Sequence, residues 1–368
     1  MATRLGWILA CVLGVVGLPA EAGSKIVAYV TGGSVPAVIH AEKLTHIDYA
    51  FAHIAAGRAV LDAPGAATDL ATVRALKKSN PSLKILVSVG GWTADGFSDA
   101  ALTEASRQAF ASSVLEMLRQ YDLDGVDLDW EYPGQGVAGI KYRPEDKDNF
   151  TLLLKTLREA LGDHYLLTIA AADREYFDHV EMSRLQVYVD WINEMAYDFF
   201  NSLTPTTGHH AGLYLSKSGT PADRTADAAV KQYLAAGVPA DKIVLGVPFY
   251  GRAFAGVTAK NRGIDQPYER FQDFYSYGDL VEKFVGKQGY VRYWDAAAEA
   301  PYLWNEKSRS FISYEDPQSL AVKVCYARDR HLGGVMFWEL KLDRGDELLD
   351  VIARGCASPG PTAAARSR

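Results

Sequence analysis

The chain has 368 residues, of which 48% are apolar and 23% are charged, so it has ample material for a hydrophobic core. Its formal charge at pH 7 is −7, and no run of lysine and arginine residues occurs along it. Nucleic-acid-binding proteins usually carry a basic patch, so we expect no nucleic-acid partner.

The first 22 residues have the layout of a secretory signal. Arg4 precedes an apolar run from Leu5 to Leu18, and an A-x-A pattern ends at Ala22. The run is shorter than the about 20 residues that a membrane-spanning helix needs. We therefore predict a signal peptide over 1–22, cleavage near Ala22, a secreted protein and no stable membrane association. An uncleaved anchor is the alternative.

Eight apolar, β-rich segments alternate with segments of helical period through the rest of the chain. The predicted strands cover 25–30, 46–54, 84–91, 125–131, 165–171, 188–197, 242–250 and 332–338. The helical segment at 105–121 places Phe110, Val114 and Leu118 on one side. Strands that alternate with helices are typical of parallel βα units, and eight of them favour a closed (β/α)8 TIM barrel.

The segment after the seventh predicted strand breaks this alternation. About sixty residues, rich in aromatic side chains, pass before the next helical segment, which is too long for a plain loop. We predict a small α+β insertion over 254–312 within a barrel domain over 23–356, and a disordered tail over 357–368. Beyond the signal, Cys325 and Cys356 either form a disulfide or are two separate buried thiols.

The fourth predicted strand carries a row of acids within LDGVDLDWEYP (123–133). Successive strand residues face opposite sides, so Asp127, Asp129 and Glu131 share one face and the apolar residues between them share the other. The apolar face suits packing against helices, so the acids point into the barrel. Enclosed like charges raise at least one pKa, and Glu131 lies at the C-terminal mouth, where barrel enzymes have their active sites. A protonated carboxyl there is suited to donate a proton to a leaving group.

Two other interpretations of this row are open. The acids could form a solvated edge or be satisfied by hydrogen bonds in the core, or they could bind a divalent metal. No histidine or further acidic cluster completes a metal site, so we predict no metal and no cofactor.

The spacing Asp124-x-x-Asp127-x-Asp129-x-Glu131 resembles the signature of glycoside hydrolase family 18, the chitinases and their relatives. The segments 88–91, 195–198, 246–254 and 333–340 resemble those on strands three, six, seven and eight of that family. The resemblance extends in this order along nearly the whole mature chain.

This resemblance implies a retaining hydrolase in which the N-acetyl group of the substrate attacks its own anomeric carbon. Glu131 is then the general acid and later the general base. Asp129 orients the N-acetyl N–H and balances positive charge, and Asp127 shares a proton with Asp129. Tyr197 completes the catalytic set by hydrogen bonding to the acetamide oxygen, whereas Asp124 is structural.

Further substrate contacts are expected at strand ends, because the C–H faces of sugar rings pack on aromatic rings. The resemblance places Trp338 under the −1 sugar and Trp92 on the aglycone side. The other expected substrate-binding residues are Tyr29, Phe51, Gly91, Met195, Asp198, Tyr250 and Arg252. Arg252 is also compatible with a plain surface ion pair, and His209 and His210 are expected in a solvated loop.

Chitin or a chito-oligosaccharide is the predicted partner of a monomeric protein. An endo-β-N-acetylglucosaminidase that acts on glycans is one alternative, and a metal-dependent hydrolase is another. A chitinase-like lectin is a third, but such lectins typically lack the acid at the position of Glu131.

Overall fold

The structure is a computed structural model that describes residues 24–356; the predicted signal peptide and tail lie outside these residues. The strands are β1 Lys25–Thr31, β2 His46–Ala55, β3 Arg58–Val60, β4 Lys84–Gly90, β5 Gly125–Asp129, β6 Leu166–Ala171, β7 Trp191–Glu194, β8 Ile243–Pro248, β9 Tyr250–Ala255, β10 Arg270–Ser276, β11 Val291–Asp295, β12 Ala300–Asn305, β13 Ser310–Ser313 and β14 Gly334–Trp338. The α-helices are α1 Ala66–Ala75, α2 Phe97–Leu102, α3 Glu104–Tyr121, α4 Asp146–Leu161, α5 Met182–Leu185, α6 Ala226–Ala235, α7 Tyr277–Lys283, α8 Pro317–Asp329 and α9 Glu347–Arg354.

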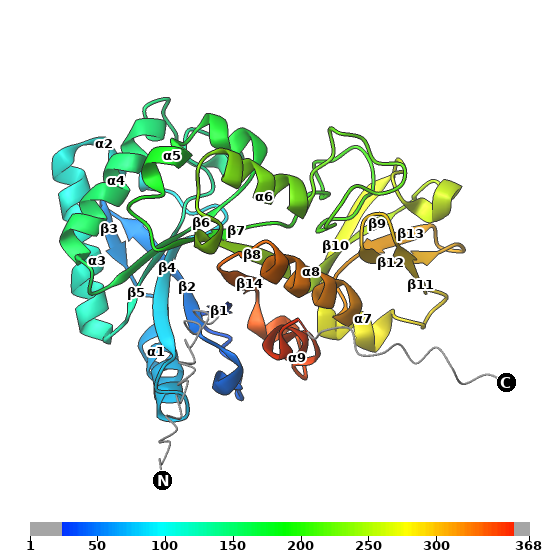
Figure 1. The fold of residues 1–368 in the computed structure, drawn as a ribbon, viewed down its shortest axis with the longest axis horizontal. Helices are drawn as coiled ribbons and strands as arrows, with labels where there is room; N and C mark the ends of the chain where they lie inside the picture. Colours follow the sequence, from blue (N-terminus) through cyan, green and yellow to red (C-terminus); the bar gives the residue numbers. More distant parts are fainter. Residues whose placement is uncertain (1–23, 357–368) are drawn as a thin grey trace, which may run out of the picture.

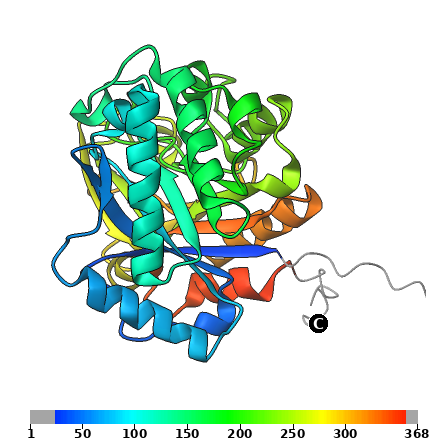
Figure 2. The same cartoon turned by 90° about the vertical axis from the view of Figure 1, so that its left-hand side faces the viewer.

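Eight parallel strands form a closed barrel. Their order around the barrel is β1, β2, β4, β5, β6, β7, β8 and β14, and the pairing of β14 with β1 closes it. Helices α2 to α5 cover one side of these strands (Figure 1), and the long helix α3 lies across their outer face (Figure 2). The predicted (β/α)8 TIM barrel is confirmed.

The alternation predicted for the acidic strand matches the packing on both sides of β5. Val126 and Leu128 are buried in the large core between the barrel and its helices. The interior holds a separate, smaller apolar cluster that includes Tyr29, Trp191 and Met336. The acids on the inner face of β5 therefore share the barrel interior with apolar side chains from several strands.

Three barrel strands end earlier than their apolar sequences predict. β5 ends at Asp129, two residues before Glu131, and β7 ends at Glu194, so Met195 and Tyr197 follow it. β8 ends at Pro248, and Tyr250 begins β9 of the insertion. The apolar residues beyond these three ends pack against the core at the mouth, but they do not continue the pairing of the barrel strands. Several predicted site residues therefore lie in the loops at the mouth and not in the barrel strands.

The insertion after β8 is an antiparallel sheet of five strands in the order β10, β9, β13, β12 and β11, together with helix α7. Phe254, Trp304 and Phe311 belong to its own apolar core. It lies at one end of the molecule beside the barrel (Figure 1). Only Phe249 separates β8 from β9, so the insertion begins directly at the barrel mouth.

Cys325 and Cys356, whose pairing the sequence leaves open, form a disulfide. It connects helix α8 to the residue that lies two positions after α9 and joins positions 31 residues apart. Within residues 24–356, no helix has both the length and the apolar character that crossing a bilayer requires.

Candidate active site

Asp127 is fully buried on the inner face of β5 and has four hydrogen-bond donors. Its register partners Ser88 on β4 and Thr168 on β6 donate their hydroxyl groups at 2.7 and 2.6 Å. Tyr29 donates its hydroxyl at 2.8 Å, and Nδ2 of Asn193 lies 3.4 Å from Oδ1. Burial raises the pKa of Asp127, while these hydrogen bonds lower it. The pKa of Asp127 is raised overall, but because every donor favours the charged form, the hydrogen bonds reduce the rise that burial causes.

Within the described residues 24–356, Asp129 and Glu131 lack such a set of donors. Asp129 is buried, and its Oδ1 has no hydrogen-bond partner in the described part of the chain. Burial raises the pKa of Asp129 well above its usual range, and the charges of Glu131 and Asp127 add to this rise. Burial also raises the pKa of Glu131 to about 7, against a hydrogen bond with Tyr132 that lowers it. The raised pKa values therefore favour the protonated forms of these two carboxyls near neutral pH.

A fourth buried carboxyl, Asp48 on β2, lies near the row and is absent from the sequence predictions. Burial, and then the charge of Asp127, raise the pKa of Asp48 well above its usual range. Nδ2 of Asn193 on β7 lies 3.2 Å from Oδ2 of Asp48 and 3.3 Å from the hydroxyl of Tyr29. The indole N–H of Trp191 donates to Asn193 at 2.9 Å, which fixes that amide. The alternation of strand residues within HIDYAF (46–51) is the sequence signal that could have identified Asp48 as a residue of the barrel interior.

Two glycines at the end of β4 allow the backbone to approach the row closely. Gly90 has φ 122°, and a side chain there would overlap the carbonyl oxygen of Asp129. Gly91 has φ 92°, and a side chain there would overlap the ring of Phe51. Both angles lie in the region that favours glycine. The missing side chains at these two positions leave room for the backbone of Asp129 and the ring of Phe51.

Aromatic side chains gather at the strand ends around the row. Trp338, at the end of β14, is nearly parallel to the ring of Phe51 at 5.6 Å and lies 5.5 Å from the ring of Tyr29. Trp92 is 54% exposed and makes an edge contact with Tyr132 at 6.5 Å. The structure thus brings Trp338, Phe51 and Tyr29 together, and it leaves Trp92 open to solvent.

Tyr197 and Asp198 follow β7 and face the insertion. The ring of Tyr197 makes an edge contact with Tyr250 at 6.3 Å. Nε and Nη2 of Arg252 donate to the two carboxylate oxygens of Asp198 at 2.8 and 2.6 Å. Burial works against the charge of Asp198, but His210 and Arg252 outweigh it and hold the pKa of this carboxyl below its usual range. Arg252 therefore forms an ion pair with Asp198, a residue that we predicted from the sequence to bind substrate.

The family model described as glycosyl hydrolases family 18 matches residues 25–343. This chain belongs to glycosyl hydrolases family 18.

Several relatives of this family 18 hydrolase have names or solved structures. It is 44% identical over 299 residues to Chitinase A1 of Niallia circulans, covering 74% of this chain but only 42% of that protein. A family 18 N-acetylglucosaminidase from Paenibacillus barengoltzii has a similar structure, with a TM-score of 0.86, 42% identity and coverage of 90% of this chain and 100% of that one. Chitinase ChiA74 from Bacillus thuringiensis gives a TM-score of 0.86 at 35% identity, covering 92% of this chain and 71% of that one.

Asp124 lies at the opposite end of β5 in this family 18 hydrolase. It accepts the backbone N–H of Ile85 at 2.8 Å and forms ion pairs with Lys77 at 2.5 Å and Lys84 at 3.5 Å. These contacts hold the entrance of β5 against β4, which agrees with a structural role for this first acid of the signature.

The expectation that His209 and His210 lie in a solvated loop is wrong. Their side chains are 4% and 0% exposed. Nε2 of His209 lies 3.2 Å from Oδ2 of Asp295, and the backbone N–H of His210 donates to Oγ of Ser313 at 2.8 Å. The loop after β7 is packed against the insertion, which lies about 85 to 105 residues further along the chain. A local sequence pattern cannot predict a contact between residues so far apart in the chain.

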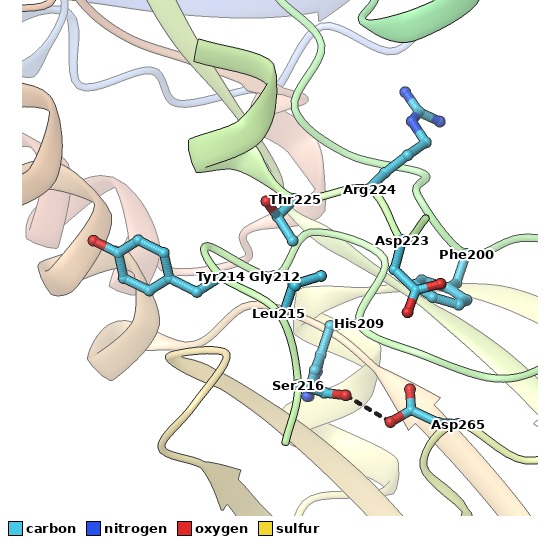
Figure 3. Close-up of a pocket in the computed structure, with 10 residues that line it drawn as sticks. All are labelled: Phe200, His209, Gly212, Tyr214, Leu215, Ser216, Asp223, Arg224, Thr225 and Asp265. Atoms are coloured by element: carbon cyan, nitrogen blue, oxygen red, sulfur yellow. Dashed lines mark hydrogen bonds between the residues drawn. The ribbon is translucent and has the colours of Figure 1, made fainter. Parts of the chain in front are cut away.

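A small cavity in the loop between β7 and α6 is separate from the carboxyl row. It is lined by Phe200, His209, Gly212, Tyr214, Leu215, Ser216, Asp223, Arg224, Thr225 and Asp265 (Figure 3). Its volume of about 10 Å³ has room for one water molecule. None of the predicted site residues lines this cavity.

Proposed function

We propose that this hydrolase cleaves β-1,4-linked N-acetylglucosamine polymers with retention, using the N-acetyl group of the substrate as nucleophile. The observation that carries this proposal is the acidic row that runs along β5 and ends just beyond it at Glu131. Burial raises the pKa of Glu131 to about 7, and Asp129 has an unpartnered oxygen beside it. The similarity to proteins named chitinases supports the substrate class.

In the first step, protonated Glu131 donates its proton to the glycosidic oxygen, and the bond from that oxygen to the anomeric carbon breaks. The acetamide oxygen of the same sugar forms a bond to the anomeric carbon and closes an oxazolinium ring. Asp129 accepts the acetamide N–H with its free oxygen and balances the positive charge of the ring. Tyr197 donates to the acetamide oxygen, and the proton of Asp129 passes toward Asp127.

In the second step, Glu131 acts as a carboxylate. It removes a proton from water, which attacks the anomeric carbon from the face that the leaving group occupied, and the oxazolinium ring opens. The product keeps the configuration of the substrate, and Glu131 is again protonated. Trp338 lies under the reacting sugar, and Phe51 supports it by stacking against its ring.

A second candidate is an N-acetylglucosaminidase that releases single sugars. The full-length match to the Paenibacillus barengoltzii enzyme favours it. An endo-acting enzyme on N-glycans and a non-catalytic lectin are weaker candidates, the lectin because Asp127, Asp129 and Glu131 are all present.

Product analysis separates these functions. Purified protein is incubated in parallel with chitohexaose and with an N-glycopeptide, and the products are identified by mass spectrometry. A chitinase releases chitobiose and chitotriose, whereas release of N-acetylglucosamine alone assigns the second candidate. Cleavage of the glycopeptide with no action on chitohexaose would contradict the proposal.

We expect kcat/KM on chito-oligosaccharides to fall as the pH rises through about 7, the value to which burial raises the pKa of Glu131. The acid form donates the proton, so activity is retained below this pKa and lost above it. A pH–rate profile of the wild-type enzyme measures this fall in kcat/KM. An activity that stays constant up to pH 9 would contradict the assignment of Glu131 as the acid.

We also propose that residues 1–22 are removed on export, that residues 23–356 form the catalytic domain together with its insertion, and that the mature enzyme is a monomer. The mass of the protein recovered from the culture medium tests cleavage near Ala22, and light scattering measures its oligomeric state.

A further inference from the structure

We propose that His210 is a positioning residue that holds the carboxylate of Asp198 in place for the sugar. The inference rests on the proposed function, because it assigns a role to a residue beside the −1 site.

The imidazole of His210 is fully buried next to Asp198. Its Nδ1 lies 3.5 Å from Oδ1 of Asp198, and its ring lies 5.3 Å from that of Tyr250. Neither ring nitrogen has a hydrogen-bond partner within residues 24–356. A buried polar atom without a partner is costly, and the carboxylate is within a few tenths of an ångström of hydrogen-bond distance from Nδ1. A small inward movement of Asp198 would bring its carboxylate to hydrogen-bond distance from this nitrogen.

His210 itself is fixed from two sides. Its backbone N–H donates to Oγ of Ser313 at 2.8 Å, and its carbonyl accepts the N–H of Phe199 at 3.0 Å. Ser313 on β13 is the register partner of Arg252 on β9. Strands β9 and β13 therefore fix the positions of both Arg252 and His210 beside the carboxylate of Asp198.

Asp198 needs more than one partner to hold its orientation. It has φ 57°, and its side chain is 32% exposed, so it is partly open to the mouth beside Tyr197. Arg252 binds both carboxylate oxygens, and its guanidinium lies over the rings of Tyr250 and Phe274 at 5.1 and 5.8 Å. Without His210, the ion pair can move as a unit, away from the sugar.

His210 is suited to this role as a neutral donor. Burial lowers the pKa of its imidazole, and Arg252 and Lys323 lower it further, against the charge of Asp198. These three are the charged groups that face the ring from β9, α8 and the loop after β7. A neutral N–H is a group that an asparagine amide reproduces at nearly the same position.

The experiment compares His210→Ala with His210→Asn. We expect His210→Ala to raise KM for chitohexaose roughly tenfold, the value of one lost hydrogen bond to a charged group, with a smaller change in kcat. His210→Asn should remain within about threefold of the wild type because its amide replaces Nδ1. His209→Ala is the matched control: it removes a buried histidine of the same loop that contacts Asp295 instead, and its KM should stay within about threefold of the wild-type value.

A double-mutant cycle shows whether His210 acts through Asp198. If it does, adding His210→Ala to Asp198→Asn costs little more than Asp198→Asn alone. Fully additive losses, or equal losses for the alanine and asparagine variants, would overturn the proposal.

The same comparison is made without turnover, by measuring Kd for chitohexaose in a Glu131→Gln background. A roughly tenfold weaker Kd with His210→Ala supports the role, and an unchanged Kd overturns it. Absence of wild-type turnover would instead contradict the proposed function, which keeps the two failures distinct.

Discussion

Glu131→Gln is expected to lower kcat on chitohexaose by about 1,000-fold or more, since a positioned general acid contributes roughly 100- to 10,000-fold. Glutamine has nearly the size of glutamate and keeps its hydrogen bonds, but it cannot give a proton to the glycosidic oxygen or later remove one from water. Binding should survive, so Kd for chitohexaose should stay within about threefold of the wild-type value. Initial-rate kinetics and calorimetry measure the two quantities.

Glu194→Gln is a matched control for this substitution. Glu194, unlike the partly buried Glu131, is fully buried, and it is the last residue of the barrel strand β7. Burial raises its pKa well above the usual range. It follows Asn193, which points into the barrel, so it faces the helices instead of the row. Its variant should keep kcat within about threefold of the wild type. Undiminished turnover by Glu131→Gln would end the assignment of Glu131 as the acid.

Asp129→Asn is the second substitution with a large expected effect, a loss of about 100- to 1,000-fold in kcat, as for the removal of one preorganised group that stabilises transition-state charge. Asparagine can still accept the acetamide N–H through its oxygen. It cannot carry the negative charge that balances the oxazolinium ring. The loss should therefore appear mainly in kcat and not in KM.

Steady-state kinetics of Asp129→Asn on chitohexaose, with circular dichroism to verify folding, measures this effect. Because Asp129 has a raised pKa and an unpartnered oxygen, the neutral variant should fold at least as stably as the wild type at neutral pH. A kcat within threefold of the wild type would show that the row does not stabilise a positive charge.

The carboxyl row was predictable from sequence because strand alternation is local. Three acids at every second position, alternating with Val126, Leu128 and Trp130, determine both faces of this segment without knowledge of any other strand. The closed barrel followed from the count of alternating elements, and the insertion followed from the length of the gap after the seventh strand.

The partners of the row were harder to predict because they come from other strands. Asp48 and Asn193 lie in mainly apolar segments, and only closure of the barrel brings both near Asp127. The burial of His210 depends on Ser313, which is 103 residues away. Such contacts between distant parts of the chain leave no periodic pattern in the sequence.

The comparison of chitohexaose with its fully de-acetylated counterpart tests the central claim most directly. Both hexasaccharides are given to the wild-type enzyme at the same pH, and kcat/KM is measured for each. If the N-acetyl group is the nucleophile, removing it should lower kcat/KM by at least about 1,000-fold, because an intramolecular nucleophile of high effective molarity is lost. Comparable rates on the two substrates would contradict the account.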